Sequence, residues 1–119
     1  MKDYVVVERF EDVVDICFYI EHEEVMAVAQ EMENINPDAY MNGYNWEMFF
    51  DYYLGKYYPK LLEGLDTDPE AGMYSACYEW SEENEERAKQ FGELICKLIE
   101  EKEELYRIVR EEGDGIEWD

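Results

Sequence analysis

The sequence predicts an α+β fold in which a small antiparallel sheet, formed by an opening hairpin and one later strand, packs with three to four helices. β-branched and aromatic residues dominate two adjacent segments near the amino terminus. Apolar residues then recur at helical spacing in three longer segments, and strand composition returns once before the last of them. The predicted element order is β-β-α-α-β-α, and the length of 119 residues favours a single domain over residues 1–119.

The opening hairpin is predicted from residues Tyr4 to Phe10 and Val13 to Ile20. Both segments are rich in side chains that fit the pleated surface of a sheet, and Glu11 and Asp12 supply the turn between them. Alternate residues of the second segment share one face because side chains alternate along a strand. The apolar residues on that face are Val14, Ile16, Phe18 and Ile20.

A first helix is predicted from Glu23, where the spacing of apolar residues changes to three and four. Its apolar face consists of Val25, Val28, Ala29, Met32 and Ile35. His22 is placed to cap or line the start of this helix, and Asn36 and Pro37 end it. The same two residues can begin a short helical turn that stops at Gly43.

The second long helix contains a dense stripe of aromatic residues. Asn45 is its predicted cap, and Pro59 breaks or redirects it. Large apolar side chains at one-face spacing are expected to lie in the core. These residues are Trp46, Phe49, Phe50, Tyr53, Leu54 and Tyr57.

The last third of the chain predicts a turn, a strand and a long helix. Asp68–Gly72 has the cap, proline and glycine pattern of a single helical turn, and Met73–Trp80 has strand composition. Ser81 then caps a helix whose apolar residues recur over roughly 28 residues, as far as Gly113.

Acids precede bases by four residues three times on this last helix, and each such pair contributes about 0.2–0.5 kcal/mol. The predicted pairs are Glu85 with Lys89, Glu93 with Lys97, and Glu103 with Arg107. Because these acids are expected to be neutralised within the chain, Glu93 and Glu103 are expected to matter little for binding a partner.

Signs of catalytic chemistry are sparse. His22 is the only histidine, and the chain contains neither a glycine-rich phosphate loop nor a D-x-D-x-D-G cation loop. The sequence therefore predicts a protein that is not an enzyme, with no catalytic residue, no metal ligand and no cofactor. A metal-dependent hydrolase built from the abundant carboxylates is a weaker alternative.

The three cysteines indicate an intracellular protein. Cys17, Cys77 and Cys96 are odd in number, widely spaced and set in apolar runs, so free thiols are expected rather than a disulfide framework. The amino terminus does not have the pattern of a signal peptide, and no apolar segment is long enough to cross a bilayer. The predicted location is cytoplasmic.

The charge balance indicates the kind of partner. The net charge is −22, and between Phe10 and Glu86 the only basic residues are Lys56 and Lys60. Such a chain repels nucleic acid and anionic lipid, so neither is expected as a partner. A basic protein is the expected partner, and its approach is accelerated by the acidic field.

A candidate binding patch lies on the predicted aromatic helix, on the side opposite its core stripe. That side mixes carboxylates with an apolar residue, Met48, and an aromatic anchor, Tyr52, as interface hot spots do. The carboxylates of the following segment carry no predicted internal partner and extend the patch. The full candidate set is Glu47, Met48, Asp51, Tyr52, Asp66, Asp68 and Glu70.

Three segments resemble the family of bacterial immunity proteins catalogued as immunity protein fifty-one. They are Tyr40–Glu47, which contains the most specific run, GYNWE, then Asp68–Tyr74, and the tail from Glu104 to Trp118. The resemblance extends from about Glu21 to the carboxyl terminus. In the GYNWE region the cap and stop roles of Asn42, Gly43 and Asn45 are sufficient to explain those residues.

The resemblance implies a small cytosolic protein, encoded beside a polymorphic or contact-dependent toxin, that binds the carboxy-terminal domain of that toxin. From the acidity of the chain we expect the toxin to be a basic, nuclease-like domain, because enzymes that cut DNA or RNA hold phosphate on basic surfaces. The alternative is an acidic regulator that mimics nucleic acid and sequesters a basic host protein.

Overall fold

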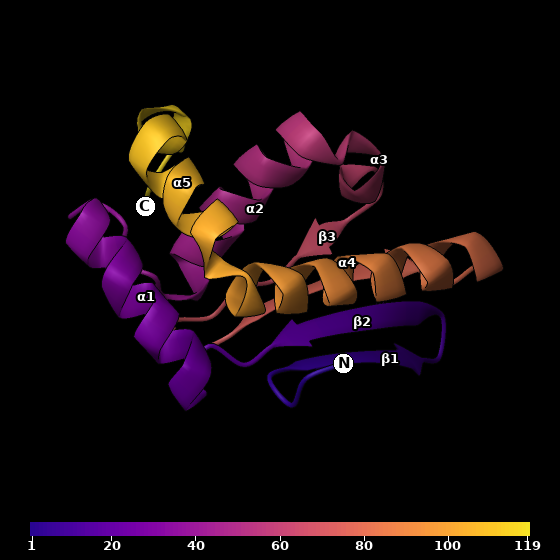
Figure 1. Ribbon diagram of the computed structural model, residues 1–119. Helices are drawn as coiled ribbons and strands as arrows, with labels where there is room; N and C mark the ends of the chain where they lie inside the picture. The colour runs from indigo at the N-terminus through magenta and orange to yellow at the C-terminus, as the bar shows by residue number, and fades with distance from the viewer.

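A computed structural model describes residues 1–119 as a four-stranded antiparallel sheet with five α-helices and a short 3-10 helix (Figure 1). The predicted α+β class is confirmed. In chain order the elements are β1 (Val5–Phe10), β2 (Val13–Phe18), α1 (Glu23–Ile35), α2 (Gly43–Tyr57), α3 (Pro59–Leu62), β3 (Asp66–Thr67), β4 (Tyr74–Glu79), α4 (Glu82–Glu100), α5 (Lys102–Glu112) and η1 (Gly113–Gly115).

The sheet has the strand order β1-β2-β4-β3, and α4 packs along one of its faces (Figure 1). On β2 the side chains of Val14, Ile16 and Phe18 are buried on the helix-covered face, as predicted. The intervening residues Asp15 and Cys17 are only half-buried and belong to the opposite face, which no helix covers. The sheet therefore has one core face and one open face.

Trp46 lies at the centre of the core. Its ring is 1% exposed and lies 5.0 Å from that of Phe18, 5.9 Å from Phe49 and 5.5 Å from Phe50, measured between centroids. The aromatic stripe is therefore core, as predicted, except at Tyr57, which is 38% exposed. These contacts join α2 to β2 through ring edges and faces, the arrangement that aromatic pairs prefer.

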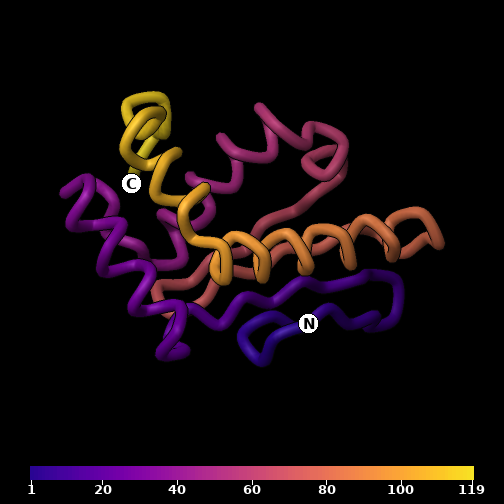
Figure 2. The backbone as a smooth tube through the Cα atoms, in the orientation of Figure 1, coloured from indigo at the N-terminus to yellow at the C-terminus, as the bar shows by residue number.

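The cap of α2 differs from the prediction. Asn42, not Asn45, is the cap, because its backbone is extended and its Oδ1 accepts a hydrogen bond from the Asn45 amide N–H at 2.9 Å. Asn45 is itself buried, donates from Nδ2 to the Tyr40 carbonyl at 2.7 Å, and accepts from the Asp119 amide at 2.6 Å. Asn45 thus holds the end of the chain beside the start of α2 (Figure 2).

The two predicted single helical turns are absent. After α1, the Asn36 side chain accepts a hydrogen bond from the Asp38 amide, and only a local turn forms before α2. In the segment Asp68–Gly72, backbone pairing replaces the helical turn, since Asp68 donates to Ser75 and Glu70 bridges Met73. It continues the pairing of β3, in which Asp66 lies opposite Cys77 and Thr67 opposite Ala76, a strand of two residues that the sequence prediction did not include.

The predicted continuous last helix is broken at Glu101. The backbone of Glu101 has φ −102° and ψ 59°, and α5 leaves α4 in a new direction to pack on α1 (Figure 1). Of the three predicted ion pairs only Glu85 with Lys89 is found, at 3.9 Å. Neither Glu93 nor Glu103 has a basic partner within 4 Å.

The three cysteines are free in the structure, Cys96 being buried and Cys17 and Cys77 half-buried. Burial raises the pKa of each thiol, and the charge of Asp15 raises the pKa of Cys17 and Cys77 further. We expect slow reaction of the native protein with a thiol reagent at pH 7, because little thiolate is present. After denaturation without reductant, three thiols per chain should titrate, and a lower count would contradict free cysteines.

Candidate functional site

The residues of the predicted binding patch come from two segments of the structure, α2 and the stretch between α3 and β4. Asp51 on α2 is exposed, and desolvation together with neighbouring Glu47 raises the pKa of its carboxyl. Glu47 is half-buried and accepts a hydrogen bond from the Thr67 hydroxyl, while Met48 packs against the core. The members that belong to the segment between α3 and β4, all exposed, are Asp66, Asp68 and Glu70.

The sequence predicted Tyr52 to be an exposed anchor of the patch, but the structure places it in contact with another helix. Its side chain is half-buried, and its hydroxyl donates a hydrogen bond of 2.7 Å to Oε1 of Glu112 at the end of α5. Sequence spacing on α2 could not reveal this contact, because the position of Glu112 depends on the break at Glu101. Tyr52 therefore connects α2 to α5 within the fold.

The open face of the sheet is strongly acidic. Glu8, Asp15, Cys77 and Asp66 face one another in register across all four strands, so that three carboxylates share one row. Glu8 lies directly opposite Asp15, an arrangement of like charges that destabilises a sheet. We call this surface the acidic sheet face, and its carboxylates are Glu8, Asp15, Asp66, Asp68 and Glu79.

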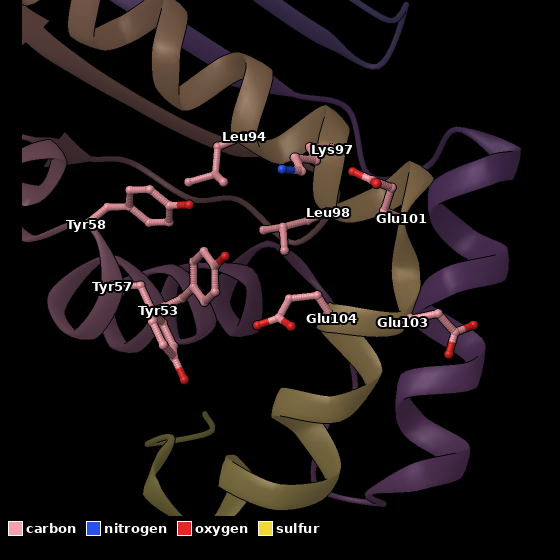
Figure 3. Close-up of a pocket in the computed structure, with 9 residues that line it drawn as sticks. All are labelled: Tyr53, Tyr57, Tyr58, Leu94, Lys97, Leu98, Glu101, Glu103 and Glu104. Carbon is pink, nitrogen blue, oxygen red and sulfur yellow. The ribbon is translucent and has the colours of Figure 1, made fainter.

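A surface hollow of about 610 Å³ lies between the end of α2, the second half of α4 and the start of α5 (Figure 3). A second hollow of about 540 Å³ shares four of its residues and extends it toward Lys60 on α3. We call the combined feature the tyrosine groove. The residues that line its larger part are Tyr53, Tyr57, Tyr58, Leu94, Lys97, Leu98, Glu101, Glu103 and Glu104.

Glu112 fixes one wall of the tyrosine groove. Its Oε2 accepts hydrogen bonds from the Tyr57 hydroxyl at 2.6 Å and from Nη1 of Arg107 at 3.0 Å. Its Oε1 accepts from Nζ of Lys56 at 2.6 Å and from the hydroxyl of Tyr52. Lys56, the two tyrosines and Arg107 hold the pKa of the Glu112 carboxyl well below its usual value. The Tyr57 ring is therefore held in place at the protein surface.

We expect Glu112→Gln to lower the free energy of unfolding at pH 7 by about 1–3 kcal/mol, because charge-assisted hydrogen bonds are lost. A lowered folded-state pKa stabilises the fold above the unfolded value, near 4.5, and this stabilisation is lost as the pH falls through the folded value. The difference between wild-type and variant should therefore be largest at neutral pH and shrink in acid. Urea unfolding across this range measures it.

Glu111→Gln is the matched control for that experiment. Its carboxylate is 56% exposed and lies 3.9 Å from Arg107, a surface pair of small energy. A constant difference for Glu112→Gln from neutral to acidic pH, or an equal loss in Glu111→Gln, would contradict the stabilising role of the Glu112 network.

Comparison with known families gives one match. The family described as Immunity protein 51 matches residues 5–114. The chain belongs to this immunity protein family. The match begins at Val5 and so includes the opening hairpin, which the resemblance from about Glu21 onward did not cover. No curated protein and no solved structure matched the chain.

The acidic sheet face and the tyrosine groove both lie within residues 5–114, the region that the Immunity protein 51 family matches. No helix is both long enough and apolar enough to cross a membrane. No group of three or more histidine, cysteine or acidic side chains is arranged to hold a metal ion. The residues of the tyrosine groove that the sequence did not indicate as part of a candidate site are Tyr57, Tyr58, Leu94 and the glutamates around the helix break.

Proposed function

We propose that this immunity protein binds the carboxy-terminal domain of a cognate toxin and neutralises it, in the cytoplasm of the producing cell and without catalysis. Membership of the immunity protein family carries this proposal. The toxin belongs to a polymorphic or contact-dependent growth inhibition system and is encoded beside the immunity gene. Inhibition is stoichiometric, so one immunity protein is needed for each toxin domain.

The proposed toxin domain is a basic nuclease. The net charge of −22 and the row of Glu8, Asp15 and Asp66 on the acidic sheet face support a cationic partner. A nuclease must present Lys and Arg to phosphate, and the immunity protein competes for such a surface. The charge also gives the complex a fast, salt-sensitive association rate.

The candidate contact residues Glu47, Met48, Asp51, Tyr52, Asp66, Asp68 and Glu70 remain our proposal for part of the toxin-facing surface. The exposed acids among them contribute mainly to steering, since a carboxylate attracts a cation across a Debye length of about 8 Å at physiological salt. Met48 and Tyr52 contribute less free area than the sequence suggested, because both are half-buried.

The toxin domain encoded beside this gene tests the proposal directly. It should bind the purified immunity protein in a one-to-one complex and lose its nuclease activity. Neutralising Asp51, Asp66, Asp68 and Glu70 to Asn or Gln should slow association more than it speeds dissociation, and should flatten the dependence of the on-rate on salt. Absence of binding to the adjacent toxin domain would contradict the immunity function.

A charge-matched control removes four exposed acids from elsewhere. Glu93 and Glu103, expected from sequence to be neutralised, are unsuitable because they line the tyrosine groove. Glu82 and Glu83 at the start of α4, with Glu23 and Glu24 at the start of α1, are exposed and replace them. Equal slowing by both sets would mean that bulk charge alone guides the toxin. A gene neighbourhood without a toxin would favour the acidic regulator of a basic host protein.

A further inference from the structure

We propose that the tyrosine groove is the anchoring site for an arginine side chain of the toxin domain. This inference rests on the proposed function and adds the chemistry by which the toxin is held. The guanidinium stacks on the exposed ring of Tyr58, beside the buried ring of Tyr53, and meets the carboxylates of Glu101 and Glu104. The aliphatic part of the arginine packs against Leu94 and Leu98, which form the facing wall (Figure 3).

The aromatic side of the groove is exposed and ordered. Tyr57 and Tyr58 are 38% and 42% exposed, although their rings pack within 5.1 Å and 5.8 Å of the buried Tyr53 ring. The hydroxyl of Tyr57 is held by Glu112. Ordered aromatic rings lose little entropy on binding and are frequent interface hot spots.

The acidic end of the groove favours a cation. Glu101 has no basic partner within 4 Å, and its carboxylate points toward the groove (Figure 3). Glu104 is paired with Arg107 at 2.7 Å and also points toward Tyr53. The break in the long helix places both acids opposite the tyrosines, because Glu101 ends α4 and Glu104 lies in the first turn of α5.

Arginine fits this arrangement better than other occupants. Its planar guanidinium stacks on aromatic faces and binds carboxylates with several N–H donors at once, which a lysine ammonium cannot do. A second copy of this chain carries the same charge of −22 and would be repelled. Lys97 is the one cation that lines the larger hollow. Because it has no ion pair within 4 Å, it competes with the incoming arginine for the carboxylates of the groove.

A peptide titration tests the groove without the toxin. We would add acetyl-Ala-Arg-Ala-amide and, separately, its uncharged citrulline counterpart, and follow the ring resonances of the tyrosines by NMR. The arginine peptide should shift Tyr53, Tyr57 and Tyr58, whereas Tyr40, which is 64% exposed on another surface, should not move. Equal shifts from the citrulline peptide, or shifts of Tyr40 as large as those of Tyr58, would overturn the proposal.

The toxin complex provides the second test. Tyr58→Ala should raise the dissociation rate about tenfold or more, and Tyr40→Ala should change it less than about twofold. If Tyr58→Ala folds poorly, Leu94→Arg replaces it as the test. This variant places a guanidinium of the protein itself in the groove and should weaken binding to a similar extent. Replacing Glu101 and Glu104 with Gln should weaken binding more than replacing Glu82 and Glu83, and Lys97→Gln should tighten it.

These outcomes separate the groove from the function. Toxin that is neutralised equally by wild-type, Tyr58→Ala and Leu94→Arg proteins would overturn the groove while leaving the immunity function intact. If the adjacent toxin domain does not bind wild-type protein at all, the proposed function fails, and the peptide titration alone decides whether the groove recognises arginine.

Discussion

Gly43→Ala is expected to destabilise the fold at or above the upper end of the range of about 1–3 kcal/mol that overpacking usually produces. Gly43 is the first residue of α2, and a Cβ atom there would overlap the backbone carbonyl oxygens of Glu70 and Met73. Backbone cannot move aside as the end of a side chain can. The Gly43 amide also donates to the Ala71 carbonyl at 3.0 Å, so the start of α2 and the turn before β4 must separate together.

Gly55→Ala is the matched control, in the same helix. Its Cβ would meet only Cδ2 of Leu62, at 3.8 Å, which is ordinary contact. Alanine at an exposed helical position should stabilise the protein by about 0.5–1 kcal/mol relative to glycine. Urea unfolding followed by circular dichroism measures both variants. A Gly43→Ala protein as stable as wild-type would show that α2 and the turn are not in close contact.

Local patterns predicted much of the fold because they depend on local physics. The two-residue period of β2, the helical period of α1 and the cap by His22, whose Nδ1 accepts from the Glu24 amide at 3.3 Å, follow from neighbouring residues alone. The break at Glu101 does not. The apolar spacing continues through the break, and Glu101–Glu104 are good helix formers, so neither pattern indicates an interruption. The break is associated with the packing of α5 on α1, which is a tertiary contact.

The same limit explains why the groove was missed. Tyr57 fits the apolar stripe of α2, and spacing alone places it in the core. Its exposure depends on where α5 lies, which in turn depends on the break. Tyr52 was predicted to be an exposed anchor because its partner Glu112 is distant in sequence, and helix spacing cannot reveal such a contact. Asp66 and Asp68, for which the sequence indicated no internal ion-pair partner, are exposed and have no basic partner within 4 Å.

Trp46→Ala is expected to lower the free energy of unfolding by about 3–5 kcal/mol, since a large buried aromatic leaves a cavity in addition to losing its transfer energy. This is a large part of the total stability of a typical domain, about 5–15 kcal/mol. Trp46 touches rings from both the sheet and its own helix, so no single neighbour can fill the space.

Trp46→Phe separates the contribution of ring volume from that of the indole N–H. Nε1 of Trp46 is buried and has no hydrogen-bond partner within the protein, so the replacement breaks no hydrogen bond to another residue. We therefore expect a much smaller loss than in Trp46→Ala, set by the reduced packing alone. Thermal and urea unfolding of the two variants test this. Equal losses in the two variants would contradict a dominant contribution from ring volume. Two variants as stable as wild-type would place Trp46 outside the core.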